Sequence, residues 1–129
     1  YLSNLIKYLN KKNKNIIVVG NAEFSNFTYL SLSLAKRLSK NKIRKEELGN
    51  IIYLNKSKRV QKYNLIIEKI ANLNNVKYFS EFDLYCNEKK ECNLITDNFE
   101  PFFYDNMHLT TQGSKNIKNK LIKFIQQNL

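Results

Sequence analysis

The chain has 129 residues, 43% of them hydrophobic, with a single Pro and three Gly. This length allows one domain with a modest core, and the composition argues against a disordered or fibrous protein. The net charge of +11 is compatible with a nucleic-acid or anionic membrane surface. We favour a general Lys-, Asn- and Ile-rich bias, because the lysines are spread over predicted helices and termini rather than gathered in one stripe.

The first half of the chain alternates helical and strand patterns. Leu2, Leu5, Ile6 and Leu9 recur at helical spacing and predict the end of an amphipathic helix over residues 2–12. Residues 16–19 form a short β-branched run before Gly20, which is typical of a buried parallel strand. A loop over residues 21–28 follows, and then a second predicted helix over residues 29–40.

The second half continues the alternation. Residues 51–54 fit another short strand or an extended connector, and Ser57 is a candidate cap for a helix ending near residue 73. Residues 76–79 predict the next strand, and residues 81–98 look irregular. Thr110 or Thr111 should cap a final helix whose buried side carries Ile117, Leu121, Phe124 and Ile125. The alternation predicts an α/β domain with a parallel sheet.

Two cysteines, Cys86 and Cys92, enclose a short polar segment. With no third thiol and only one histidine in the chain, a zinc site is not expected. We favour a local disulfide, which would imply an oxidising compartment, over two free thiols, since polar loop cysteines would otherwise be exposed and reactive.

The only histidine, His108, follows Asp105 by three residues and precedes Leu109, a Thr pair and Gly113. This spacing lets the carboxylate turn back onto the imidazole, which would fix its tautomer and fit it for general-base catalysis. The simpler alternative is a helix-entry loop in which Asp105 forms the turn and His108 packs or is exposed. The adjoining Phe102, Phe103 and Tyr104 fit core and pocket wall better than a sugar-stacking platform.

The segment from Tyr104 to Gly113 resembles the last conserved block of the SGNH, or GDSL-like, hydrolases, Asp-x-x-His-Leu-Ser/Thr-x-x-Gly. The order of strand, helix, strand and cysteine loop is similar to one branch, the extracytoplasmic SGNH domains fused to membrane acyltransferases that O-acetylate cell-surface sugars. The resemblance implies a three-layer α/β/α sandwich of the flavodoxin-like SGNH kind. It also implies that Asp105 and His108 are catalytic, with no cofactor and no metal.

The sequence departs from that family at the nucleophile. No Gly-Asp-Ser motif is present, and Ser25, the serine nearest a strand end, lacks the glycine-flanked turn of a nucleophile. Gly20-Asn21 could stand in for the family's oxyanion-hole Gly and Asn, but it follows a later strand, which argues against this role. We therefore expect residues 1–129 to be the carboxyl-terminal portion of one SGNH domain, without the amino-terminal strand–helix block.

The resulting hypothesis is that the chain supplies half of a serine esterase or O-acyltransferase site, which acts on an acetyl or similar ester of a surface polysaccharide. Without the nucleophile block, the chain alone is expected to be inactive. The resemblance implies an extracytoplasmic location, tethered to the inner membrane through a preceding region. It implies as partners the rest of the SGNH domain, a membrane acyltransferase domain and a carbohydrate, with no specific nucleic acid. The alternatives are a non-catalytic basic module that binds anionic glycan or nucleic acid and a flavodoxin-like regulatory domain.

Overall fold

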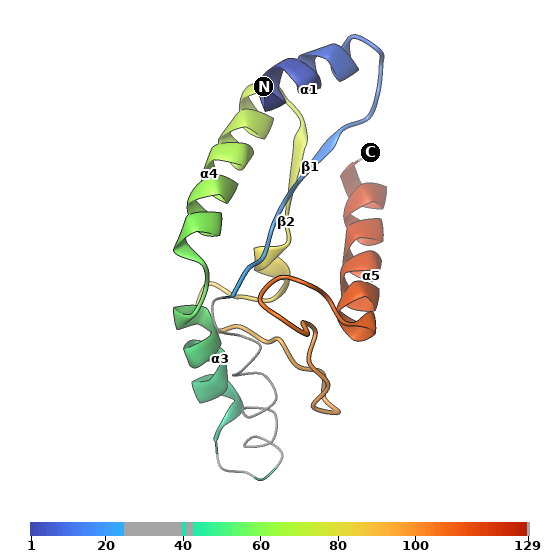
Figure 1. The fold of residues 1–129 in the computed structure, drawn as a ribbon. Coiled ribbons are helices and arrows are strands. Elements are labelled where there is room, and N and C mark those ends of the chain that lie inside the picture. Colours follow the sequence, from blue (N-terminus) through green and yellow to red (C-terminus); the bar gives the residue numbers. More distant parts are fainter. Residues whose placement is uncertain (25–39, 41–42, 129) are drawn as a thin grey trace.

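The computed structural model describes residues 1–24, 40 and 43–128 (Figure 1). Along the chain come α1 (Leu2–Asn10), β1 (Ile17–Gly20), α3 (Lys45–Leu54), α4 (Lys58–Leu73), β2 (Lys77–Ser80), the 3-10 helix η1 (Phe82–Leu84) and α5 (Thr111–Asn128). Apart from residue 40, the helix predicted over residues 29–40 lies outside the described residues, and so does Ser25.

The two strands pair in parallel, with Ile17 opposite Lys77 and Gly20 opposite Ser80. Helix α4 packs against both strands, and α5 contacts β2 from the other side, so that the strands lie between two helices (Figure 1). The predicted α/β class with a parallel sheet is therefore confirmed. Both strands end toward the long loop that leads into α5 (Figure 1).

The buried side chains form two clusters. The smaller one, around Ile6, Val18 and Ala71, joins α1 and α4 to the sheet. The larger one lies beyond the carboxyl ends of the strands, and its aromatic centre packs edge to face: Phe103 is 5.8 Å from Phe24 and 5.1 Å from Tyr85 between ring centroids. Such aromatic pairs add to the stabilisation from burial alone. The larger cluster therefore forms a rigid support beneath the loop that follows Phe103.

Several predicted elements are confirmed. Helix α1 matches the amphipathic pattern at the amino terminus, and β2 matches the predicted strand. Ser57 caps α4, because its Oγ accepts a hydrogen bond from the Val60 N–H at 3.4 Å. Val60 and Ala71 face the core from α4, while Ile67 and Ile70 pack at the edge of the smaller cluster.

Three details of the sequence prediction are wrong. Residues 51–54 are neither strand nor connector but the last turns of α3, whose buried Leu48 and Ile52 are four residues apart and whose first turn is acidic. Val19 is 51% exposed, because α5 covers its neighbour Phe79 but leaves β1 open on that face. Ile125 is 38% exposed, since Phe124 takes the position over the sheet.

Candidate active site

The loop between β2 and α5 closes into a tight hairpin around Asp105 and His108. Phe103 and Leu109 form an antiparallel bridge, and the Tyr104 N–H donates to the His108 carbonyl oxygen at 3.0 Å. Phe103 is fully buried, so its side chain anchors one side of the hairpin in the larger core cluster. The residues at the tip of the hairpin are thereby held above the core and remain open to solvent.

Asp105 makes three hydrogen bonds within its own loop. Its Oδ1 accepts from the backbone N–H of Met107 at 2.9 Å and of His108 at 2.7 Å. Its Oδ2 lies 2.6 Å from Nδ1 of the His108 ring. The predicted contact between carboxylate and imidazole is therefore present, and it leaves Nε2 as the ring nitrogen that faces away from Asp105.

The electrostatics of this pair favour an ionised carboxylate. The backbone hydrogen bonds from Met107 and His108, followed by the bond to the His108 side chain, lower the pKa of Asp105 from 3.8 to about 2. Hydrogen bonds to the charged form of an acid have this effect because they stabilise the anion. The His108 side chain is 59% exposed, so its ring is accessible to a hydroxyl group from solvent or substrate.

The start of α5 fixes the loop from the other side. The Thr110 hydroxyl accepts from the Gly113 N–H at 3.1 Å and donates to the Pro101 carbonyl oxygen at 2.7 Å, so Thr110 is the helix cap. Gly113 is buried, and a Cβ atom there would collide with the carbonyl oxygen of Phe102. The threonine and glycine of the motif thus have structural roles, because they bring α5 close against residues 101–102.

The hairpin contacts the segment that leaves β1. The Phe24 N–H donates to the Asn106 carbonyl oxygen at 3.0 Å, which joins the tip of the hairpin to the chain four residues beyond the strand. Open α/β sheets place ligand groups at the carboxyl ends of their strands. Asp105 and His108 therefore lie at the end of the sheet where a site is expected.

Two polar side chains that the sequence did not single out hold the turn after β1. The buried Asn64 of α4 accepts from the Asn21 N–H at 3.0 Å and donates to the Asn21 carbonyl oxygen at 2.7 Å. The Glu81 carboxylate accepts from the Ala22 N–H at 3.2 Å, and burial raises the pKa of Glu81 above its usual value. No local motif indicates these contacts, since their partners are 43 and 59 residues apart.

These contacts bear on the suggested oxyanion role of Gly20-Asn21. The backbone N–H groups of Asn21 and Ala22 are already donated to side chains, so neither is open to an oxyanion in this arrangement. At Gly20 a Cβ atom would collide with the Tyr78 side chain, which explains the glycine by packing. That this pair does not replace the family's oxyanion hole stays a prediction, because these bonds do not involve the Asn21 side chain, which is exposed.

The cysteine loop packs beside α3. Cys86 and Cys92 are joined in a disulfide, and the Cys92 N–H donates to the Gly49 carbonyl oxygen at 3.0 Å. A Cβ atom at Gly49 would lie only 3.2 Å from the Cys92 carbonyl oxygen, so the glycine permits close packing. The two cysteines are buried in the larger core cluster with the aromatic residues, and the loop contributes no group to the Asp105–His108 pair.

The described residues contain no cluster of three or more His, Cys, Asp or Glu side chains placed to hold a metal ion. None of their helices combines the length and the hydrophobicity that crossing a bilayer requires.

The three aromatic residues before the motif lie in different environments. Phe103 belongs to the core, Phe102 packs at the edge of the core, and Tyr104 is 58% exposed beside His108.

Comparison with models of known protein families identifies the family of the chain. The family model described as the SGNH domain fused to AT3 domains matches residues 1–123. The match covers nearly the whole chain, so the chain belongs to this family, and the suspected resemblance is confirmed. No curated protein matches the sequence. Membership makes this an esterase- or acyltransferase-type domain of proteins in which an AT3 acyltransferase domain is the partner.

Proposed function

We propose that Asp105 and His108 are the acid–base half of a serine esterase or O-acyltransferase site that handles acetyl or similar esters of a cell-surface polysaccharide. The observation that carries the proposal is the 2.6 Å contact between Asp105 Oδ2 and His108 Nδ1 on an exposed ring. The ionised carboxylate orients the imidazole and stabilises the imidazolium that forms during the reaction.

The reaction uses the free ring nitrogen twice. His108 Nε2 takes the proton of a serine hydroxyl as the serine oxygen attacks the acyl carbonyl, and then returns it to the leaving oxygen as the carbonyl–oxygen bond breaks. In the second half, a sugar hydroxyl or water attacks the seryl ester and gives its proton to Nε2. That proton then passes to the departing serine oxygen, which restores the starting state.

We further propose that residues 1–129 form the carboxyl-terminal portion of a single SGNH domain whose serine is carried by another segment. Two features support this. Parallel sheets are normally covered on both faces and rarely consist of two strands alone. Here Val19 is half exposed, and among the described residues β2 is the only strand that pairs with β1. An additional strand–helix unit would cover Val19 and bring a nucleophile to the carboxyl ends of the strands.

We also propose that the domain lies outside the cytoplasm, tethered to the inner membrane beside a membrane acyltransferase domain that supplies the acyl group. The Cys86–Cys92 disulfide supports this location, because disulfides persist in oxidising compartments. The acceptor is then a carbohydrate hydroxyl. No cofactor or metal has a part in the proposed steps, which need only the serine, His108 and Asp105.

The test is made on the protein in which this chain is joined to the serine-bearing segment. His108→Ala should reduce hydrolysis of nitrophenyl acetate by about a thousandfold or more, because the serine loses its base. His108→Gln, which keeps a polar side chain of similar size without a titratable ring, should lose as much. Unchanged turnover in both variants would refute the assignment.

A further inference from the structure

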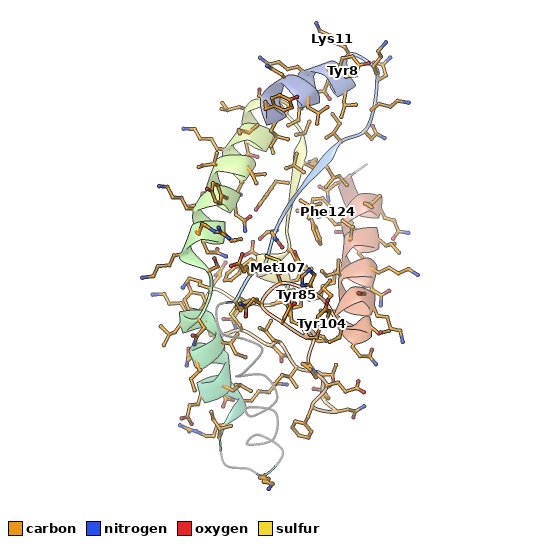
Figure 2. The ribbon with its side chains drawn as sticks, viewed as in Figure 1. Tyr8, Lys11, Tyr85, Tyr104, Met107 and Phe124 are labelled. Atoms are coloured by element: carbon orange, nitrogen blue, oxygen red, sulfur yellow. A yellow bond between two sulfur atoms is a disulfide. The ribbon has the colours of Figure 1, made fainter. Side chains whose placement is uncertain are left out.

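The aromatic ring of Tyr104 lies flat against the imidazole of His108. The two ring centroids are 5.5 Å apart and the ring planes are inclined by only 14°, which is an offset stack. Tyr104 is 58% exposed and lies on the loop beside α5 (Figure 2), so this ring is not needed to fill the core. Because its partner is the only histidine of the chain, the ring can act directly on the candidate catalytic residue.

The contacts of His108 show what this stack adds. The hydrogen bond to Asp105 fixes one atom, Nδ1, at 2.6 Å from Oδ2. It restrains this one distance but still permits coupled rotation about the χ1 and χ2 torsions of His108, and such a rotation would swing Nε2 through an arc. An aromatic surface parallel to the ring opposes that rotation, because it loses the contact on one side and creates a clash on the other.

The hairpin holds Tyr104 in place for this task. The Tyr104 N–H donates to the His108 carbonyl oxygen, so the two residues are cross-strand neighbours. The neighbouring Phe103 is buried, which directs Tyr104 to the opposite, solvent-facing side.

We propose that Tyr104 is a positioning residue, whose ring face aligns the imidazole of His108 so that Nε2 points at the reacting hydroxyl. This inference rests on the proposed function of His108. It assigns the role to the ring face and not to the phenol hydroxyl. Phenylalanine should therefore replace Tyr104, whereas alanine should not.

The kinetic test compares Tyr104→Ala and Tyr104→Phe in the protein joined to its serine-bearing segment. Tyr104→Ala should lower kcat about three- to tenfold, the range that an aromatic contact represents, with KM changed less than about twofold. Tyr104→Phe should have the same kcat as the parent protein, because it keeps the ring face. Tyr63→Ala is the matched control, because Tyr63 is 57% exposed on α4 and its removal should change neither parameter.

A second measurement reports the stack without relying on activity. The chain has one histidine, so its imidazole proton resonances are assigned at once by NMR. The Tyr104 ring current should displace them, and Tyr104→Ala should remove the displacement while Tyr104→Phe and Tyr63→Ala keep it. Circular dichroism checks that each variant is folded.

The outcomes separate the two proposals. If His108→Ala abolishes turnover but Tyr104→Ala retains full kcat, the positioning role is wrong and the proposed function stands. If Tyr104→Phe loses as much kcat as Tyr104→Ala, the hydroxyl is responsible and the inference is overturned. If His108→Ala leaves turnover unchanged, both proposals are refuted, whatever the NMR spectra show.

Discussion

The hairpin with Asp105 and His108 and the turn that follows β1 meet at one end of the sheet, yet they use polar groups in opposite ways. In the hairpin, Asp105 bonds to residues two and three positions away, and the His108 ring stays exposed. In the turn, Asn64 and Glu81 come from distant parts of the chain and occupy the backbone of Asn21 and Ala22. The hairpin thus leaves a reactive imidazole exposed to solvent, whereas the polar groups of the turn are hydrogen-bonded to Asn64 and Glu81 and stabilise the fold.

The comparison implies that mutations in the two regions should have different consequences. Changes at Asp105 and His108 at the tip of the hairpin should affect activity with little effect on stability, because their side chains contact mostly one another and solvent. Changes in the turn should affect stability first, since they leave buried polar groups without partners. Four experiments test this division, in order of decreasing expected effect.

The largest effect should come from Asp105→Asn. Without the negative charge, the imidazole loses the group that orients it and stabilises its cation, so kcat on nitrophenyl acetate should fall by about three to four orders of magnitude. Asp97→Asn is the matched control, because the Asp97 side chain is 98% exposed and its ion pair with Lys45, at 3.5 Å, lies away from the hairpin. A loss below tenfold for Asp105→Asn would show that the hairpin is a helix-entry loop and not a catalytic pair.

Asn64→Ala should produce the largest change in stability. It leaves the N–H and the carbonyl oxygen of Asn21 without their present partners and should lower the free energy of unfolding by about 2–4 kcal/mol. Urea denaturation of the chain measures this change. Asn72→Ala on the exposed side of the same helix should cost less than about 1 kcal/mol, and equal losses in the two variants would contradict the division.

Glu81→Gln should have a smaller effect that depends on pH. The pKa of Glu81 is raised in the folded chain, so its contribution to stability is present below its ordinary pKa and declines as pH rises through the raised value. Gln keeps an acceptor for Ala22 and removes the desolvated charge. We expect the free energy of unfolding at pH 7 to change by less than about 1 kcal/mol and to vary less with pH.

The control for that experiment is Glu88→Gln, since Glu88 is exposed in the disulfide loop. Its stability-versus-pH curve should follow that of the parent chain. A Glu81→Gln variant that unfolds more readily at neutral pH by several kcal/mol would show that the charge itself holds the turn.

The smallest expected change is in the titration of Asp105. Because its folded pKa is lowered to about 2 from 3.8, its contribution to stability is present above pH 4 and is lost only as pH falls through about 2. The NMR shift of the Asp105 carboxyl carbon should therefore show no titration step centred near pH 3.8 in the folded chain. The same carbon in the urea-unfolded chain should titrate near 3.8, and a midpoint near that value in the folded chain would contradict the hairpin geometry.

The hairpin was predictable because its interactions are local. Asp105, His108, Thr110 and Gly113 lie within nine positions, so the spacing alone implied a carboxylate beside the imidazole and a capped helix. The two strands and the cap at Ser57 were predictable for the same reason. The four-residue run at 51–54 was not, because so short an apolar run fits a strand or a buried helix equally well.

The sequence by itself thus determined the α/β class, the family, the candidate catalytic pair and the closely spaced cysteines. Only the tertiary structure decided that Asn64 and Glu81 hold the turn after β1, that Val19 stays half exposed, and that Tyr104 stacks on His108. The reason is physical. Backbone periodicity and short loops are encoded by neighbouring residues, whereas the partners of buried polar groups and the exposure of a strand residue depend on how distant segments pack together. The Tyr104–His108 contact is local, but it forms only once the hairpin has closed and Phe103 is buried.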